Sequence, residues 1–278
     1  MASGVILFSI SCPTTSRNAC RIIVSICPVR KFGLIGFPLG HSFSRKYFTE
    51  KFLREHIKGC SYENFPIDDI SKLPALVESE GSLEGLNVTI PYKAEVLRYL
   101  DRIEQEASEV GAVNVIKIRR NSISTELHGF NSDITGIRDT LIPLMNPEVK
   151  SALILGTGGA SKAVCYVLDK ISVQYTLISR TRKPGCLTYS DINKETIDSI
   201  QLIINTTPLG MFPETESRPD LNYDLLDERH LLFDLVYNPE MTPFLREGQE
   251  RGCMIVNGMQ MLISQAERSW EIWNDNNL

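Results

Sequence analysis

The first half of the chain alternates short apolar runs with amphipathic segments, a pattern typical of mixed α/β domains. Apolar runs that meet Gly or Pro predict strands, and apolar residues spaced three or four apart predict helices. Strands are expected at residues 31–36, 62–66, 83–90, 112–119 and 124–129. Helices are expected at residues 43–53, 67–80 and 94–108. The last two strands are expected to pair as a hairpin around Asn121.

A second α/β unit is expected after a helix at 134–145 that leads out through Pro143 and Pro147. The continuous apolar run at 151–156 predicts a buried strand, and residues 160–170 predict the helix that follows it. Further strands are expected at 175–179, 202–205, 231–236 and 254–256, and a closing helix at 259–273. The pattern therefore predicts two α/β lobes.

Composition excludes several classes of protein. Of 278 residues, 42% are apolar and 23% charged, which excludes disorder, collagen and coiled coil as the main state. A net charge of −5 without a basic stripe argues against nucleic-acid and membrane partners. Seven cysteines without CxxC or Cys/His spacing predict no metal site and favour a reducing, cytoplasmic location. Both a monomer and a homodimer fit the sequence.

Residues 1–30 differ from the rest of the chain. They carry Arg17, Arg21 and Arg30 and no acidic residue, so the net charge of −5 is the balance of +3 here and −8 elsewhere. Three of the seven cysteines also fall in this segment. We interpret it as a non-essential N-terminal extension. A targeting peptide is the alternative, because residues 4–13 resemble the apolar core of one.

A glycine-rich turn opens the second lobe, between its first strand and first helix. It consists of Gly156, Gly158, Gly159 and Ala160. Glycines permit a tight turn and a close approach of the backbone to a pyrophosphate, which the amides and the dipole of a helix N-terminus attract. This context predicts a dinucleotide site, with a simple strand-to-helix turn as the alternative.

The end of the second strand predicts which dinucleotide is bound. An NAD site places an acidic residue there, whereas this strand ends in Ser179, Arg180 and Thr181. A guanidinium can bind a 2′-phosphate, so NADP is expected rather than NAD, with a solvated basic loop as the alternative. After Thr181 there is little room for a crossover helix, so the Rossmann-type unit is expected to be trimmed there. Residues 205–211 follow a later strand and are expected near the nicotinamide.

The first lobe gathers small polar residues after its predicted strands. Four clusters contain these residues. Ser42 and Ser44 form the first, and Asn87, Thr89 and Lys93 form the second; Asn114 belongs to the third and Asp133 to the fourth. Hydroxyls and amides suit a polyhydroxylated anion, and a Lys/Asp pair can move a proton. His41 and His128 are competing acids, which we interpret as structural. These groups predict a substrate site.

The motifs of both lobes, in order, resemble the shikimate dehydrogenase family. They are HSFS, NVTIPYK, GAVN, GFNSD, GTGGAS, SRT, NTTPLGM, DLVYNPEMTPFL and NGMQMLISQA, spanning about residues 31–278. The resemblance implies an oxidoreductase that interconverts 3-dehydroshikimate and shikimate with NADP, on the route through chorismate to aromatic amino acids. It also implies a substrate domain of residues 31–133 plus 258–278 around a Rossmann-type NADP domain of residues 134–257.

The resemblance also implies roles for individual residues. Lys93 would donate and accept the proton, paired with Asp133. The substrate carboxylate and ring hydroxyls would be bound by Ser42, Ser44, Asn87, Thr89, Asn114, Asp133, Tyr237 and Gln265. The cofactor would be bound by Gly156, Gly158, Gly159, Ala160, Ser179, Arg180, Thr181, Thr206, Met211 and Gly258.

The chain departs from the family pattern at Phe43, Arg45 and Ser132, none of which removes a hydroxyl of the substrate site. Two alternatives to this function stay open. One is a quinate/shikimate dehydrogenase that uses NAD, since the sequence does not show whether the pocket accepts an extra ring hydroxyl. The other is a non-catalytic module that senses NADP or a metabolite, which the intact Lys93/Asp133 pair disfavours.

Overall fold

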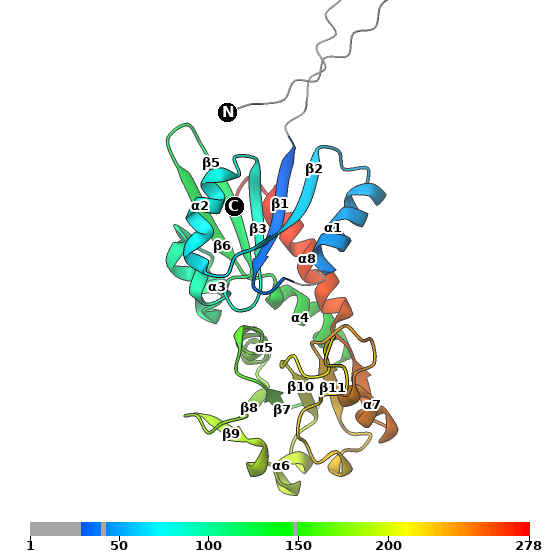
Figure 1. Cartoon of the computed structure of the whole chain (residues 1–278). Helices are drawn as coiled ribbons and strands as arrows, with labels where there is room; N and C mark the ends of the chain where they lie inside the picture. Colours follow the sequence, from blue (N-terminus) through cyan, green and yellow to red (C-terminus); the bar gives the residue numbers. More distant parts are fainter. Residues whose placement is uncertain (1–28, 40–42, 147–148) are drawn as a thin grey trace, which may run out of the picture.

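The computed structural model describes residues 29–39, 43–146 and 149–278. Two six-stranded sheets are stacked end to end, with helix α4 (Asp133–Leu141) at their junction and helix α8 (Met259–Asn274) running from the junction along the first sheet (Figure 1). The predicted two-lobed α/β architecture is confirmed. Among these residues, no helix has the length and apolar character needed to cross a lipid bilayer.

The first sheet has the strand order β2-β1-β3-β5-β6-β4. Its strands are β1 (Arg30–Gly36), β2 (Cys60–Pro66), β3 (Leu83–Val88), β4 (Arg102–Ile103), β5 (Val115–Arg120) and β6 (Thr125–Phe130). β1, β2 and β3 are parallel, and β5 is antiparallel to both β3 and β6. Since β1 begins at Arg30, that residue belongs to the sheet and not to the extension. The remaining predicted extension lies outside the described residues, except for Val29.

Helices α1 (Phe43–Arg54), α2 (Leu73–Ser79) and α3 (Gln105–Val110) accompany this sheet, with 3₁₀ turns η1 (Ile70–Lys72) and η2 (Glu95–Tyr99). The continuous helix predicted at 94–108 is wrong. Asp101 makes two hydrogen bonds with Leu127 of β6. Its backbone amide donates to the Leu127 carbonyl at 2.9 Å, and the Leu127 amide donates to the Asp101 carboxylate at 2.7 Å. The residues that follow, Arg102 and Ile103, therefore pair with the open edge of β6 as strand β4. The helix predicted at 67–80 is divided because Pro74 lies at the start of α2.

The second sheet is entirely parallel, in the order β12-β11-β10-β7-β8-β9. Its strands are β7 (Ser151–Leu155), β8 (Gln174–Ser179), β9 (Cys186–Thr188), β10 (Leu202–Asn205), β11 (Leu231–Asp234) and β12 (Met254–Val256). This is the doubly wound order of dinucleotide-binding folds, in which the strand order reverses between β7 and β10: β8 and β9 are added on one side of β7, and β10, β11 and β12 on the other. Ligands bind at that reversal, outside the carboxyl ends of the strands.

The helices of this lobe are α5 (Gly159–Lys170), α6 (Lys194–Asp198) and α7 (Pro243–Glu250), with 3₁₀ turns η4 (Tyr189–Asp191) and η5 (Tyr223–Leu225). Parallel neighbours normally need a crossover of a dozen or more residues, but only residues 180–185 join β8 to β9. The predicted trimming after Thr181 is thus confirmed, and β9 and α6, which were not predicted, are short. Sequence analysis also missed α7.

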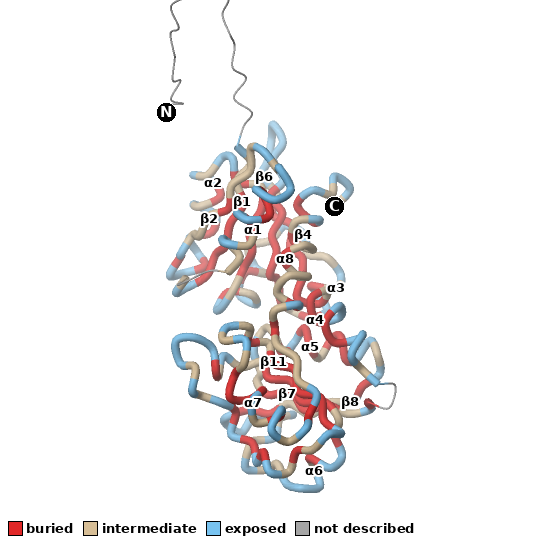
Figure 2. The backbone as a smooth tube through the Cα atoms, turned by 90° about the vertical axis from the view of Figure 1, so that its right-hand side faces the viewer, coloured by how far each residue is buried: buried red, intermediate tan, exposed pale blue. Residues whose placement is uncertain are grey.

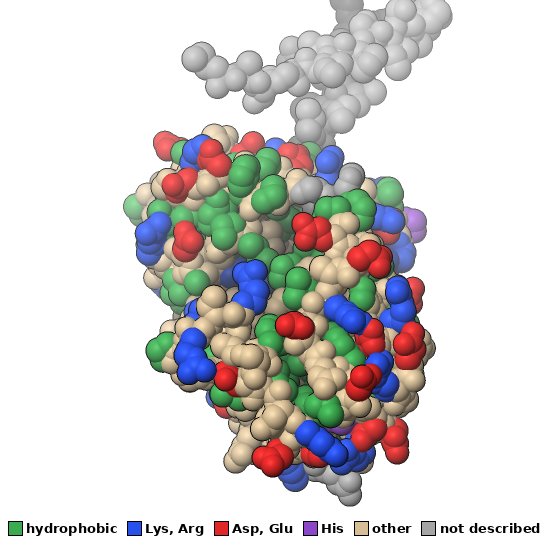
Figure 3. Space-filling model, turned by 60° about the horizontal axis from the view of Figure 1, so that its bottom comes forward, with side chains coloured by type: hydrophobic (Ala, Val, Ile, Leu, Met, Phe, Trp, Pro, Cys, Tyr) green, Lys and Arg blue, Asp and Glu red, His purple; other side chains and the backbone are tan. Residues whose placement is uncertain are grey.

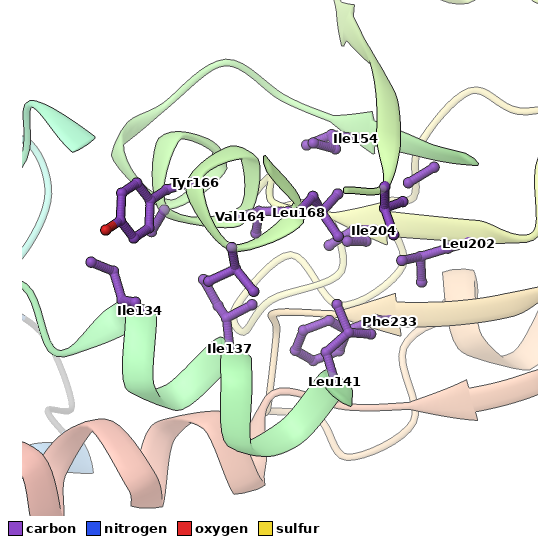
Figure 4. Close-up of a cluster of buried hydrophobic side chains, with 14 of the residues drawn as sticks. Ile134, Ile137, Leu141, Ile154, Val164, Tyr166, Leu168, Leu202, Ile204 and Phe233 are labelled. Atoms are coloured by element: carbon purple, nitrogen blue, oxygen red, sulfur yellow. The ribbon is translucent and has the colours of Figure 1, made fainter. Parts of the chain in front are cut away.

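Helix α4 joins the two cores, and η3 (Ile142–Leu144) follows it. Its side chains Ile137 and Leu141 point toward the second sheet, where they pack with Leu202 and Phe233 (Figure 4). Its opposite side meets α8 at Gly136, where a Cβ would lie 2.6 Å from the Met261 carbonyl oxygen. The small residue allows the two helices to approach closely.

Helix α8 runs back from the second lobe onto the first sheet. Trp273 stacks on Phe32 at 4.8 Å between ring centroids and donates from Nε1 to the Ile116 carbonyl at 3.0 Å. A Cβ at Gly85 would overlap the Trp273 indole. Figure 2 shows buried backbone concentrated along the strands of both lobes and along α4. The closing helix is therefore part of the first core.

Candidate active site

An ion pair between Lys93 and Asp133 lies at the junction of the lobes. Lys93 Nζ is 2.6 Å from Asp133 Oδ2, and the exposed fractions of the two side chains are 18% and 3%. Lys93 follows the carboxyl end of β3, and Asp133 begins α4. The ammonium therefore remains partly accessible to a ligand, while the carboxylate is enclosed.

Asn114 fixes the orientation of this carboxylate. Its Nδ2 group donates to Asp133 Oδ1 at 2.8 Å and to Gln265 Oε1 at 3.2 Å. Its Oδ1 accepts from the Ser132 backbone amide at 2.7 Å. Asn114 thus connects the first sheet, α4 and α8 around the ion pair, and brings together three of the predicted site residues.

A second polar group, which sequence analysis largely missed, continues from this site. The Tyr62 hydroxyl donates to Asn87 Oδ1 at 2.8 Å, and Asn87 Nδ2 donates to Ser269 Oγ at 2.9 Å. Ser132 and Ser269 hydroxyls are 3.2 Å apart, which joins the group to Asn114. Burial raises the pKa of Tyr62, so its hydroxyl stays protonated. Only the position of Ser269, one turn after Gln265 on α8, gave a signal in the sequence.

The other predicted substrate residues border this group. Ser44 lies in the first turn of α1 and interacts with the Tyr62 hydroxyl. Thr89 follows β3 and lies over Gly36, where a Cβ would be 2.4 Å from Thr89 Cγ2. Ser42 and His41 lie outside the described residues.

Tyr237 reaches the site from the second lobe, in the loop after β11. Its ring meets Phe43 of α1 edge-on, with centroids 5.4 Å apart and planes inclined by 62°. Burial raises the pKa of Tyr237. The pair makes an aromatic contact across the lobes beside Ser44.

His128, the competing acid on β6, is buried. Its Nε2 lies 2.9 Å from Glu126 Oε2, which provides a polar partner within the same strand. The Glu126 pKa is lowered by this contact. The structural interpretation of His128 agrees with this pairing.

The glycine turn lies directly against the ion pair. Gly156 has φ +114°, and a Cβ there would be 2.6 Å from Thr206 Oγ1. Gly158 caps the N-terminus of α5 and has no neighbouring atom within 4 Å of its Cβ position. A Cβ at Gly159 would lie 3.4 Å from Lys93 Cβ. The turn and the open helix terminus, with Ala160 in its first turn, therefore fit a pyrophosphate next to Lys93.

The residues at the end of β8 and just after it, 179–183, differ in their exposure and in their contacts. Ser179 is buried, whereas Arg180 and Thr181 are exposed at the strand end. Arg182 pairs with Asp191 at 3.3 Å. Lys183 Nζ instead donates to Thr157 Oγ1 of the glycine turn at 3.0 Å, a contact that sequence analysis missed.

A depression of about 600 Å³ adjoins this basic segment. It lies along α5, between Thr157, Ser161 and Lys183 at one end and Cys165 and Cys186 farther along. It occupies the flank of α5 that a crossover helix between β8 and β9 would cover. Cys165, Cys186 and Cys253 are free thiols.

A buried carboxylate holds the loops after β10 and β11. Asp234 accepts from Asn205 Nδ2 at 2.9 Å, from Thr242 Oγ1 at 2.6 Å and from the Val236 amide at 3.0 Å. Burial raises the pKa of Asp234 to about 6, against the opposite effect of these donors. This clamp positions Thr206 and Tyr237, which follow the two strands.

The remaining predicted cofactor residues line the same edge of the second sheet. Thr206 Oγ1 donates to the Leu155 carbonyl at 2.7 Å, and Met211 is 40% exposed. A Cβ at Gly258 would lie 2.2 Å from the Leu235 carbonyl oxygen, so the chain can pass there only without a side chain. On the face drawn in Figure 3, basic and acidic side chains are interspersed.

Comparison with known proteins identifies the family. Residues 34–116 match the family model described as the shikimate dehydrogenase substrate binding domain. A shikimate dehydrogenase (NADP(+)) of Clostridium beijerinckii is 37% identical over 260 residues, covering 88% of this chain and 92% of that protein. The chain belongs to the shikimate dehydrogenase family.

Two further comparisons extend this result. A shikimate dehydrogenase (NADP(+)) of Methanococcus aeolicus is 34% identical over 259 residues, covering 87% of this chain and 90% of its own. The crystal structure of a shikimate 5-dehydrogenase from Thermus thermophilus, in complex with NADP(H) and shikimate, matches with a TM-score of 0.75 and 28% identity. The match covers 88% of this chain and 93% of that one.

Within the shikimate dehydrogenase family pattern, two of the three departures of this chain, Phe43 and Ser132, have structural counterparts. Ser132 retains the hydroxyl that reaches Asn114 and Ser269. Phe43 supplies the ring that meets Tyr237. Neither change removes a polar group of the network.

Proposed function

We propose that the protein catalyses the NADP-dependent, reversible reduction of 3-dehydroshikimate to shikimate, a step in the biosynthesis of chorismate and aromatic amino acids. The 2.6 Å Lys93–Asp133 pair carries this proposal, because it lies against the glycine turn where a nicotinamide dinucleotide fits. The names of the curated relatives support both the reaction and the cofactor.

Lys93 moves the proton. Its ammonium can direct one N–H at Asp133 and another at the carbonyl oxygen of the substrate, where it stabilises the developing alkoxide and protonates it. In the oxidative direction, Lys93 accepts the hydroxyl proton. Asp133, held by Asn114, keeps the ammonium oriented in both directions. NADPH, when bound, supplies the hydride.

The substrate is held by the first lobe. We assign its carboxylate to Ser42 and Ser44, of which Ser44 lies in the first turn of α1. Its ring hydroxyls are assigned to Asn87, Thr89, Asn114, Asp133 and Gln265, with Tyr237 closing the site from the second lobe. The hydrogen bonds from Tyr62 and Ser269 support this assignment, since they fix the Asn87 amide before a ligand arrives.

The cofactor is held by the second lobe. The pyrophosphate is assigned to Gly156, Gly158, Gly159 and Ala160, and the adenosine 2′-phosphate to Ser179, Arg180 and Thr181. Thr206, Met211 and Gly258 would contact the nicotinamide end. The left-handed backbone at Gly156 and the open space over Gly158 support this fit.

The domain boundaries follow from these assignments. Residues 30–133 plus 258–278 form the substrate domain, because Arg30 begins β1, and residues 134–257 form the NADP domain. The segment before Arg30 is a non-essential extension. We place the protein in the cytoplasm, which the free thiols of Cys165, Cys186 and Cys253 favour. A monomer and a homodimer are distinguished by light scattering of the purified protein.

Absorbance at 340 nm tests the reaction, with shikimate and quinate each assayed with NADP⁺ and NAD⁺. We expect shikimate with NADP⁺ to give the highest kcat/KM. Faster turnover of quinate with NAD⁺ would favour the alternative enzyme, and binding without any turnover would favour a sensing module.

Lys93→Ala tests the proton donor in the same assay. We expect kcat to fall by about 10²–10⁴-fold, the usual contribution of a positioned acid. Lys72→Ala is the matched control, since Lys72 is an exposed lysine of the same lobe that pairs with Asp68. Equal activity of the two variants would refute the role of Lys93.

A further inference from the structure

A second depression, of about 660 Å³, lies at the far edge of the first sheet. It is bordered by the beginnings of β1 and β3, the end of β5 and the last turn of α8. Lys93 follows the opposite, carboxyl end of β3. The depression is therefore separate from the proposed active site, and none of its residues takes part in the proposed reaction.

Positive side chains dominate this depression. Arg30, Lys117, Arg119 and Arg120 line it, with Glu84 as the carboxylate among its lining residues. Glu84 Oε2 pairs with Arg30 Nε at 2.6 Å, which leaves three cations without a carboxylate from the lining. This concentration of positive charge contrasts with the net charge of −5 of the chain.

The three other cations donate mainly to carbonyl groups. Lys117 Nζ donates to the Ile272 carbonyl at 3.0 Å and to that of Asp275, both in the last turn of α8 or just after it. The Arg119 guanidinium donates to the carbonyl of the next residue, Asn276, at 3.4 Å. Arg120 donates to carbonyls at the end of α2 and the start of β3. These bonds fix the side chains in place.

Carbonyl groups offset this charge only in part. The carboxyl end of a helix contributes about half of a negative elementary charge, so the ends of α2 and α8 together offset about one of the three cations. The side chain of Asp275 is a further carboxylate that acts on Lys117. The depression keeps a positive excess.

The state of Lys117 reflects that excess. The residue is 7% exposed, and its pKa is lowered by burial and by the nearby Arg119 and Arg30 guanidiniums, against the effects of Asp275 and Glu84. These surroundings disfavour the charged form of Lys117, and an anion bound nearby would stabilise that form.

We propose that this depression is a binding site for a small anion that carries two or more phosphate or carboxylate groups. Guanidiniums match both groups through paired N–H donors. Lys117 and Arg119 contact the end of α8, and Arg120 contacts the end of α2, so cations from both faces of the sheet line the depression at the end of β5. The backbone bonds of Lys117 and Arg120 hold these two cations in place before the anion arrives, so less conformational entropy is lost on binding.

Isothermal titration calorimetry of the full chain tests the site, with inorganic pyrophosphate and citrate as probes in separate titrations. NADP⁺ and 3-dehydroshikimate are added at saturation, because both are oxidised and fill the proposed active site without turnover. We expect a Kd of about 1 mM or lower for at least one probe. The tighter of the two identifies the anion as phosphate or carboxylate in type.

Two arginine variants locate the binding. Arg119→Ser removes an exposed guanidinium and is expected to weaken the tighter probe by about ten-fold with an unchanged melting temperature. Arg102→Ser is the matched control, since Arg102 is an exposed arginine of the same sheet that lies 3.8 Å from Glu126. Absence of saturable heat with both probes, or equal affinities in the two variants, would overturn the proposal.

Discussion

Gly159, the first residue of α5, lies so close to Lys93 that a Cβ on it would be 3.4 Å from Lys93 Cβ. That distance is ordinary van der Waals contact, so a methyl group at this position would touch Lys93 without displacing it. The cofactor turn of one lobe therefore adjoins the proton donor of the other, and a larger side chain pointing the same way would press against Lys93.

This contact predicts a graded response to substitution. Gly159→Ala is expected to lower kcat less than about five-fold, whereas the branched side chain of Gly159→Val is expected to displace Lys93 and lower kcat at least about 100-fold. Initial rates at 340 nm measure both variants, with melting temperatures as the control for folding. Equal kcat values in the two variants would contradict a steric contact with Lys93.

The aromatic contact between Phe43 and Tyr237 predicts an effect on substrate binding. Phe43→Ala removes the ring that meets Tyr237, so we expect KM for shikimate to rise about five-fold with kcat changed less than two-fold. Tyr237→Phe keeps the ring contact and is expected to raise KM less. If Phe43→Ala lowers kcat and leaves KM unchanged, the contact does not serve to enclose the substrate.

The two basic residues after Thr181 are expected to differ. Lys183 contacts Thr157 of the glycine turn, whereas Arg182 pairs with Asp191. We expect Lys183→Ala to raise KM for NADP⁺ by about ten-fold and Arg182→Ala to leave it within two-fold. Repeating the assay with NAD⁺ shows whether the affected phosphate is the 2′-phosphate. Equal effects of the two variants would mean that only net charge matters.

Asp234 predicts a pH dependence of stability. Its pKa is raised to about 6 in the folded protein, so its contribution is fully present below pH about 4 and is lost as pH rises through about 6. Relative to Asp234→Asn, the wild type should lose about 2–3 kcal/mol of unfolding free energy between those values.

Urea unfolding at pH 4, 5, 6 and 7 measures this difference. Asp139→Asn, at an exposed position on α4, is the control for the removal of one carboxyl group. A difference between the wild type and Asp234→Asn that is constant with pH would show that the Asp234 pKa is not raised.

Local features of the chain were predictable from its sequence. The β7–turn–α5 unit follows from one apolar run, three glycines and one amphipathic segment within about twenty residues. The pairing of Lys93 with Asp133 was expected from the family resemblance, and the structure brings the two together.

Features that depend on distant partners were not predictable. Tyr62 and Ser269 meet at Asn87, which is 25 residues from one and 182 from the other. The segment that was predicted as helix at 94–108 is instead bound by the edge of β6, through Leu127 and Asp101. In both cases the stabilising bonds join elements whose relative position no local pattern specifies.

The short connection between β8 and β9 has a practical consequence for protein engineering. Gly185 lies at its end with φ +72° and no atom within 4 Å of its Cβ position, and the neighbouring flank of α5 is uncovered. Exposed, sparsely packed connections tolerate inserted sequence. A reporter peptide or a complete guest domain grafted between Pro184 and Gly185 would project from that flank.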